Sequence, residues 1–204
     1  MLKVSERLAE EVEQRKRELD GFGLDLRVAA PGIIRSVDYA RQTCTVQLAI
    51  RERMNRGGVL TWAEIPILPD VPFFVYSGGG YCLTLPIQPG DDCLVVFGDN
   101  CMDAWWQSGG VQNQVEKRRH DLSDGFALVG FRSQPHVVSG YSGGAAQMRN
   151  AAGDACIEIS GSSINICAAG GVHIDGGTTI DGRSFLGHTH GGVQPGGGTT
   201  GGVS

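Results

Sequence analysis

The feature that most constrains this chain is a run of short apolar pairs near its C-terminal end, between residues 140 and 186. Charged residues are sparse there, and Gly, Ser or Asn separate the apolar positions. Corresponding positions recur about every seven residues, which is typical of a short repeat of strands and tight turns. The positions are Ile157, Ile159, Ile164, Ile166, Val172, Ile174 and Ile180.

Such a ribbon has little apolar surface of its own to bury. Burying one isoleucine contributes roughly 1.5–3 kcal/mol, whereas ordering each residue costs about 1–2 kcal/mol of backbone entropy. A single ribbon with so few apolar residues is therefore not expected to be stable alone. A short intertwined triple-stranded β-helix, built from three chains with these side chains along its axis, would bury them.

The same segment can also be drawn as a two-residue hairpin, because Gly161 stands first in the turn, as a type II′ turn requires. In that register Cys156 lies opposite Cys167, and both point away from the isoleucines, which would allow a disulfide. If the chain instead winds around an axis, the two thiols could lie on different faces. The other cysteines form no CxxC pair, so free thiols are expected, and Cys44 alternates with apolar residues as a small buried side chain.

Residues 1–24 form a charged segment in which Val4, Leu8 and Val12 recur every four residues, a helical period. Glycine is a common helix stop, so Gly21 and Gly23 are expected to end this helix. The apolar stripe is narrow. A solvated helix fits the sequence, and so does a helix that packs on a partner or on its own copies.

Residues 25–135 are expected to be mostly β. Short apolar runs separated by Gly, Pro and Asp turns favour a small barrel of the OB type. The predicted strands are 27–37, 43–50, 59–67, 73–76, 81–85, 93–97 and 125–131, with one helical turn at 103–107.

The last part of the chain, residues 187–204, is rich in glycine and contains His188 and His190. In an extended chain, residues two apart point to the same side, so both imidazoles would face one way. Three copies would supply six nitrogens, which suits an octahedral metal such as iron better than tetrahedral zinc. A histidine-containing surface loop is the other interpretation of this motif, and the composition of the tail by itself predicts disorder.

Three motifs carry a resemblance to a known family. The first joins Pro89-Gly90-Asp91 and residues 95–97 to Asp103-Ala104-Trp105-Trp106-Gln107-Ser108-Gly109-Gly110, and the second is residues 120–127. The third joins Phe185-Leu186-Gly187-His188-Thr189-His190 to residues 199–201. The chain resembles the central baseplate spike of contractile-tailed bacteriophages, the baseplate assembly protein V-like, membrane-piercing family. The resemblance covers most of the chain after the N-terminal helix.

The resemblance implies a structural virion protein at the tip of the tail baseplate. It would be a homotrimer, with its barrel (25–135) attached to the baseplate hub protein and its β-helical needle (136–186) narrowing to an apex (187–204). At the apex, His188 and His190 of three chains would bind one iron ion. The spike would pierce the host outer membrane when the sheath contracts. The chain has no room between Phe131 and Tyr141 for the lysozyme domain of some members, so peptidoglycan cleavage is not implied.

Composition and motifs limit the other function classes. The net charge of −5 and the pI of about 5.5 argue against a nucleic-acid partner. No apolar run has membrane-spanning length and the N-terminus lacks a secretory signal, so synthesis in the host cytoplasm is expected. No GxSxG, P-loop or HExxH motif is present, and we expect no enzymatic activity.

Two rival functions and several residues with open roles complete the sequence predictions. A metal-dependent enzyme could use His188 and His190, although the neighbouring glycines offer no base. A trimeric β-helical carbohydrate-binding adhesin would need exposed aromatic residues, and 142–184 contain none. Trp105 and Trp106 could stack on bases or sugars, but packing in the barrel or on a hub protein is favoured. Asp91, Asp92, Asp121 and Asp124 stand in turn contexts beside glycine and are expected to be turn formers. His120, His136 and His173 are scattered along the chain and are expected to be structural or exposed, with His173 facing outward.

Overall fold

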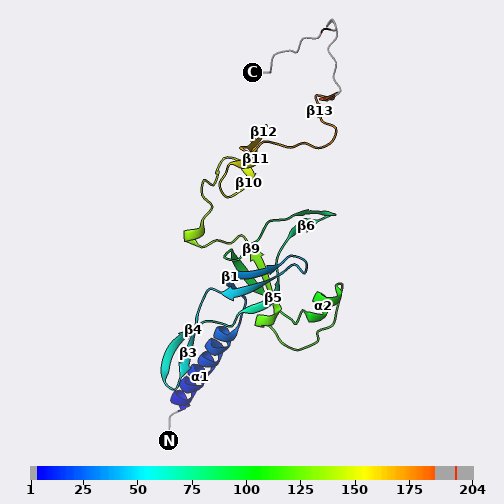
Figure 1. The fold of residues 1–204 in the computed structure, drawn as a ribbon. Coiled ribbons are helices and arrows are strands. Elements are labelled where there is room, and N and C mark those ends of the chain that lie inside the picture. Colours follow the sequence, from blue (N-terminus) through cyan, green and yellow to red (C-terminus); the bar gives the residue numbers. More distant parts are fainter. Residues whose placement is uncertain (1–3, 187–195, 197–204) are drawn as a thin grey trace. The chain divides into compact units, whose positions relative to one another are not determined.

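The computed structural model describes residues 4–186 and residue 196, and Figure 1 shows the order of its elements. The chain divides into two compact units, Met1–Val137 and Val138–Ser204. It is mainly β, as the sequence predicts, with a helix at the N-terminal end. Among the described residues, no helix is both long enough and apolar enough to cross a membrane.

Helix α1 spans Val4–Asp25, so the predicted stop at Gly21 and Gly23 is wrong. Neither glycine has a positive φ, and the N–H of Leu26 still donates to the carbonyl of Phe22 (3.1 Å). A glycine ends a helix when it turns into the left-handed conformation; inside a helix it only weakens it, by about 1 kcal/mol relative to alanine.

Five antiparallel strands form the barrel of the first unit: β1 (Ala29–Asp38), β2 (Thr43–Leu48), β5 (Leu68–Pro72), β8 (Asp92–Phe97) and β9 (Gly125–Val129). Their order is β5-β2-β1-β8-β9. The two outer strands approach each other beyond β5, where Phe73 forms a parallel bridge with Ala127 and the N–H of Phe74 donates to the Ala127 carbonyl (2.8 Å). This curled sheet has the topology expected of an OB-like barrel.

The barrel core is built from alternate residues of these strands. Ile34, Val46, Val95 and Ala127 are fully buried, and Cys44 is buried as predicted. Gly32 lies where β1 crosses this core: a Cβ there would lie 2.5 Å from Cγ1 of Val46. The sheet therefore packs this closely only with glycine at that position.

Two strands of the first unit escape sequence prediction. In the sequence, Pro66 and Pro69 are expected to close the predicted strand 59–67, yet Pro69 lies inside β5. Proline is tolerated there because β5 is an outer strand of the sheet. Strand β3 (Glu52–Arg56) is charged, and it pairs with β4 (Val59–Ala63), which ends before the predicted residue 67.

The remaining elements of the first unit are short. Strands β6 (Tyr76–Gly78) and β7 (Tyr81–Leu83) form a hairpin, so the predicted strand at 73–76 begins later than expected. The predicted helical turn is α2 (Asp103–Ser108), and two 3-10 turns span Leu122–Asp124 and Gln134–His136. The ring of Trp105 in α2 meets the ring of Phe126 edge-on, with centroids 5.9 Å apart, so Trp105 packs on the barrel.

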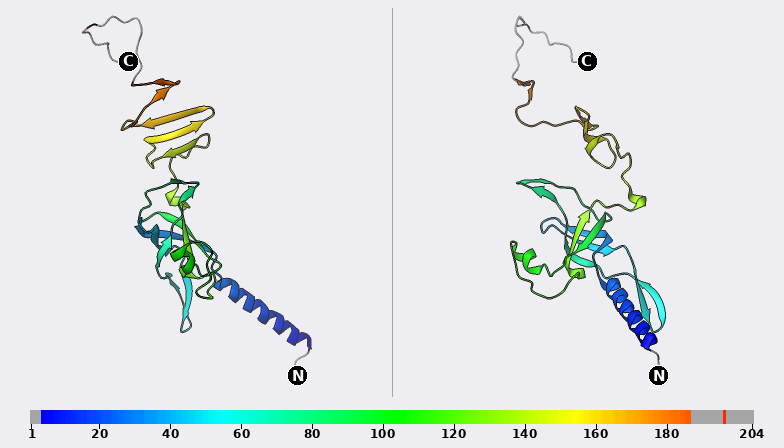
Figure 2. Two further views of the ribbon diagram at one scale, coloured as in Figure 1. Left: turned by 90° about the vertical axis from the view of Figure 1, so that its right-hand side faces the viewer. Right: turned by 180° about the vertical axis from the view of Figure 1, so that it is seen from behind.

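The described part of the second unit contains a three-stranded antiparallel sheet and a small ribbon (Figure 2). The sheet has the order β10 (Ala146–Arg149), β11 (Ala155–Ser160) and β12 (Ser163–Ala168), and we call it the C-terminal sheet. The ribbon pairs β13 (Thr179–Ile180) with β14 (Arg183–Ser184). Strands β11 and β12 form the hairpin drawn from the sequence, with Gly161 at a φ of 56° in its turn.

Candidate functional site

The C-terminal sheet brings most of the predicted trimer-core residues onto one face, which we call the apolar face. Directly opposite residues of antiparallel strands point the same way. Ile157 pairs with Met148 on one side and Ile166 on the other, while Ile159 pairs with Ala146 and Ile164. Ala155 and Ala168 extend this face by a third row. The sequence identified the isoleucines but missed β10, which supplies Met148 and Ala146.

The other face of the sheet is polar. The side chain of Glu158 occupies its middle strand and accepts hydrogen bonds from Gln147 of β10 and Asn165 of β12 (3.3 Å for Asn165). This row of side chains ties the three strands together on the solvent side. The sheet therefore has a polar face suited to contact with water and an apolar face that is not.

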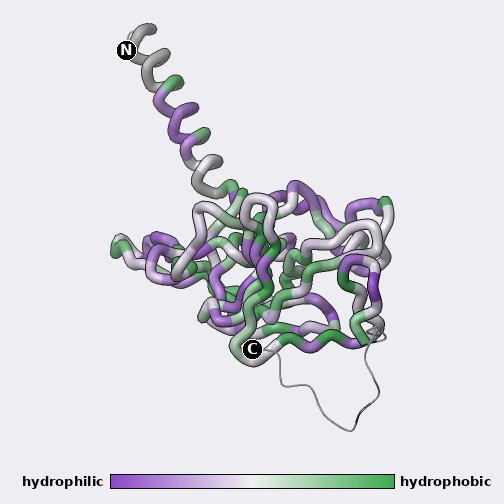
Figure 3. Tube along the Cα trace, turned by 90° about the horizontal axis from the view of Figure 1, so that it is seen from above, coloured by the Kyte–Doolittle hydropathy of each residue, from purple (hydrophilic) through white to green (hydrophobic). Residues whose placement is uncertain are grey.

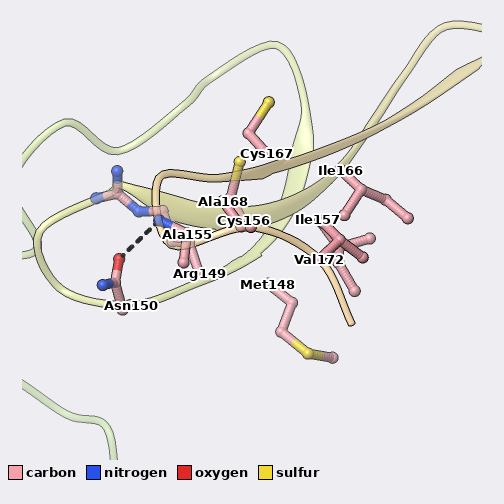
Figure 4. A pocket seen from close by; sticks show the side chains of 11 residues that line it. Met148, Arg149, Asn150, Ala155, Cys156, Ile157, Ile166, Cys167, Ala168 and Val172 are labelled. Atoms are coloured by element: carbon pink, nitrogen blue, oxygen red, sulfur yellow. Dashed lines mark hydrogen bonds between the residues drawn. The ribbon is translucent and has the colours of Figure 1, made fainter. Parts of the chain in front are cut away.

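The apolar face is uncovered in the single chain. Ile157 is 46% exposed and Ile164 is 68% exposed, and the exposed fractions of Met148, Ile159 and Ile166 lie between these two values. Figure 4 shows an open hollow on this side, lined in part by Met148, Ile157, Ile166 and Val172. A contiguous exposed patch of aliphatic side chains usually marks an interaction surface.

The last three predicted core residues lie beyond the sheet. Val172 follows β12 and lies beside Ile157 and Ile166 in the hollow (Figure 4), which joins it to the apolar face. Ile174 lies in an irregular segment, and Ile180 lies in the separate ribbon opposite Arg183. Both are exposed, and no residue pairing connects them with the sheet in the described part of the chain. Their place on a common axis stays a prediction.

Cys156 and Cys167 form a directly opposed pair on the polar face, as the hairpin register predicts. Both are free thiols here, and Figure 4 shows them on the opposite side of the hairpin from Met148 and Ile157. Partial burial and the neighbouring Cys167 raise the pKa of the Cys156 thiol. The disulfide itself stays a prediction.

The predicted metal ligands His188 and His190 lie outside the described residues. The structure therefore does not test the metal site at the apex.

A buried ion pair in the barrel unit corrects the expectation that Asp124 is a turn former; sequence reasoning missed its partner, Arg118. The carboxylate of Asp124 is fully buried and accepts from Nε (2.8 Å) and Nη2 (3.0 Å) of Arg118, and from the N–H of Met102 (2.9 Å). Arg118 also contacts Asp103 at 2.8 Å. Hydrogen bonds to Asp124 and Asp103 raise the pKa of Arg118 further above its ordinary value.

The same place brings Cys101 and Asp103 within ligand distance of Asp124, a set of donors that could suit a cation. The Arg118 guanidinium already occupies this place and makes ion-pair contacts with both carboxylates. We therefore interpret the cluster as structural: its contacts hold residues 101–103 and 118 against Asp124. Asp121 is a turn former as predicted, since its side chain accepts from the N–H of Ser123 (2.9 Å).

A second cluster joins Asp92 of β8 to Ser133 and His136. Oδ2 of Asp92 accepts from the N–H (2.8 Å) and Oγ (2.6 Å) of Ser133 and lies 2.9 Å from Nδ1 of His136. These hydrogen bonds lower the pKa of Asp92 to about 2, and those from Ser133 have the largest effect. The expectation that Asp92 is only a turn former is therefore incomplete.

This trio is not arranged as a catalytic triad. Ser133 and Asp92 share the same histidine nitrogen, Nδ1, whereas a triad needs the serine on one ring nitrogen and the carboxylate on the other. The cluster instead holds the segment that follows β9 against the first residue of β8.

Residues 30–130 match the family model described as the phage protein Gp138 N-terminal domain. The match supports a phage structural protein. It begins in β1 and ends just after β9, so it coincides with the barrel, and it supports a place for the protein in the virion. No curated protein matches the chain.

Proposed function

We propose that this phage structural protein is a homotrimeric central spike, located at the tip of a contractile tail. The observation that carries this proposal is the uncovered apolar face of the C-terminal sheet. A face of isoleucine, methionine and alanine rows beside a fully polar face is stable only when something covers the apolar side. Copies of the same face are the cover that the chain itself can supply.

Three copies suit this surface because each contributes one flat face, and three such faces enclose an axis. Their polar rows, centred on Glu158, then point outward to solvent. The intertwined β-helix expected from the sequence becomes, in this arrangement, three antiparallel sheets packed side by side. The resulting trimer would be narrow around its axis. Short strands, and small Gly, Ser and Ala residues between them, fit the limited space in such a trimer.

The apex would be closed by His188 and His190. Two imidazoles per chain give six nitrogen donors per trimer, a set that fits one octahedral iron ion. Saturated coordination leaves no position for a substrate, so the ion would be structural. Its effect would be to hold three glycine-rich chain ends together.

The mechanism is mechanical. The barrel would attach to the baseplate hub protein, and sheath contraction would drive the needle through the host outer membrane. The polar face, free of aromatic residues, offers few groups that could bind the surface it crosses. We expect no hydrolase activity, and clearing of peptidoglycan by the purified protein would contradict this.

The mass of the protein in solution tests the assembly. Light scattering after size exclusion should give about three times the chain mass of 21.6 kDa. A well-folded monomer would overturn the spike proposal.

Metal content separates the spike from the metalloenzyme alternative. Elemental analysis of the wild-type trimer should find one transition metal per three chains, lost when both His188 and His190 are changed to Ala. One metal per chain would favour the enzyme, and a trimer without metal after growth in iron-rich medium would remove the apex site from the proposal.

A further inference from the structure

Helix α1 is exposed to solvent, and its described side chains pack against no other described element. Every described side chain from residue 12 to residue 23 is exposed, including the apolar ones: Val12 (66%), Leu19 (70%) and Phe22 (67%). Isolated helices are marginal in water, and most helices in proteins are held by packing of an apolar face. The side chains of residues 12–23 show no such packing, and a partner outside the chain would supply it.

The spacing of its residues indicates what kind of partner. Val12, Arg15, Leu19, Phe22 and Leu26 follow each other at steps of three, four, three and four residues. This is the a/d pattern of a heptad repeat, with Val12, Leu19 and Leu26 at a and Arg15 and Phe22 at d. Leu8 continues the pattern at d in the sequence. A period of 3.5 residues is matched by winding similar helices around one another.

In the sequence, most other residues of α1 are polar; the exceptions are Val4, Ala9, Leu24 and two glycines. The seam therefore carries most of the apolar residues of the helix. Gln14 and Arg17 lie on the side away from it, and Nε2 of Gln14 donates to Glu18 (3.0 Å) along the helix. Figure 3 shows isolated hydrophobic positions along an otherwise hydrophilic helix. In the sequence, Glu11 precedes Lys16 by five residues, the spacing that places opposite charges across the seam of a parallel coiled coil.

We propose that α1 forms a parallel three-stranded coiled coil with the α1 helices of two other copies of this chain. The proposal rests on the trimer proposed above, which would place three α1 helices at the same end and in the same direction. Tethering of this kind raises the effective concentration of the helices, so a seam of only a few heptads is enough.

Arg15 is the one charged residue on the described part of this seam. Its alkyl stem can lie along the neighbouring helices while the guanidinium reaches solvent. A charged residue at a core position weakens a coiled coil but can fix its register. Replacing Arg15 with Leu is therefore expected to raise the temperature at which the helical circular dichroism signal is lost.

Two cysteine variants of the full chain test the arrangement. In the Val12→Cys variant the new thiols meet at the seam, whereas in the matched Arg17→Cys variant they point outward from the same helix. After mild oxidation, denaturing gels without reductant should show several-fold more covalent dimer for Val12→Cys, and peptide mass spectrometry should place the new disulfide between two copies of residue 12. The native cysteines are the same in both variants, so they cannot produce the difference.

Each outcome decides between the two proposals. Equal crosslinking of both variants in a protein that still has the mass of three chains would overturn the coiled coil and leave the spike intact. Equal crosslinking in a monomeric protein would overturn both. Preferential crosslinking of Val12→Cys in a protein of two-chain mass would overturn the trimer and with it the three-stranded form.

Discussion

The barrel and the C-terminal sheet use the same kinds of apolar residue in opposite ways. In the barrel, Ile34 and Val46 lose all contact with solvent because the sheet curls until its outer strands meet. In the C-terminal sheet, Ile157 and Ile159 occupy equally regular strands but keep about half of their surface exposed. The first region is completed within one chain, and the second is not.

The difference lies in how many strands each region has to cover its own core. Five strands can enclose a core between them, whereas three short strands give one flat face with nothing above it. The pattern of apolar residues alone does not distinguish these cases. The number of strands that the rest of the chain supplies decides whether an apolar face is a core or an interface.

The largest effect is expected from a charge on the apolar face. Ile166→Asp, or Ile159→Asp, would bury three carboxylates near one axis, at a cost of several kcal/mol each, so the trimer should not assemble. The barrel should still fold, because it has its own core. Light scattering and circular dichroism would show a folded protein of lower mass.

Ser163→Asp is the matched control for this change. Ser163 lies opposite Ser160 on the polar face of the same hairpin, so the same charge there should leave the trimer intact. Loss of assembly in both variants would mean that the two faces of the sheet are not distinct, and the comparison with the barrel would fail.

A smaller but still large effect is expected inside the barrel. Arg118→Met leaves the buried carboxylate of Asp124 without its partner, which typically costs about 3–5 kcal/mol. Arg119→Met is the control, because the neighbouring Arg119 pairs with the exposed Asp99 and should contribute less than about 1 kcal/mol. Urea unfolding followed by tryptophan fluorescence measures both. A similar loss for the two variants would show that Asp124 is not isolated from water.

The third prediction concerns the thiols on the polar face. Because Cys156 and Cys167 are directly opposed, oxidised glutathione should convert them to a disulfide by thiol–disulfide exchange: one S–S bond forms between the two cysteines, the S–S bond of glutathione breaks, and the two electrons and two protons leave with two molecules of reduced glutathione. A crosslink over so short a loop is expected to stabilise the C-terminal sheet by about 2–4 kcal/mol. Peptide mass spectrometry should find this pair and not Cys44 or Cys93, whose pKa values are raised by burial to about 11 and about 12. If Cys44 and Cys93 were oxidised before Cys156 and Cys167, the barrel core would have to be open to solvent, which would contradict the structure.

The smallest effect is a pH dependence at the end of the barrel. Hydrogen bonds from Ser133 and His136 lower the pKa of Asp92 to about 2, below the value of about 3.9 in an unfolded chain. Its contribution to stability is therefore complete above about pH 4 and is lost as the pH falls toward 2. The difference in thermal stability between wild type and Asp92→Asn should be present at neutral pH and vanish near pH 2. A stability difference that does not change with pH would show that the charge of the Asp92 carboxylate does not contribute to its contacts with Ser133 and His136.

Sequence pattern predicted the parts of the fold that depend on neighbours along the chain. Strand β2 shows the alternation of a half-buried strand, whereas β1, β8 and β9 are marked by short apolar runs bounded by turn residues. The β11–β12 hairpin follows from its turn and its paired isoleucines. Strand β5 was missed because Pro69 and Pro72 argue against a strand unless it is known to lie at an edge. The end of α1 was wrong because Gly21 permits a helix stop without requiring one.

The candidate site was predicted in part for the same reason. Register between adjacent strands placed the isoleucines on one face and Cys156 opposite Cys167. The contacts of Asp92 with His136, and of Asp124 with Arg118, depend on how distant segments meet, which no local period encodes. Met148 was missed because β10 is only four residues long and has a single large apolar residue, so its alternation of Ala146 and Met148 with polar residues is too short to stand out.

Every strand pairing of the C-terminal sheet joins consecutive strands of the same chain. Its hydrogen-bond ladders can therefore form by a unimolecular step at a rate that does not depend on protein concentration, and local hairpins of this kind form fast. In the proposed trimer only side chains cross between copies, so burial of the apolar face is a separate, concentration-dependent step. Dilution should slow burial of the apolar face without slowing the pairing of the strands, so the trimer would form from chains whose strands pair transiently in the correct register.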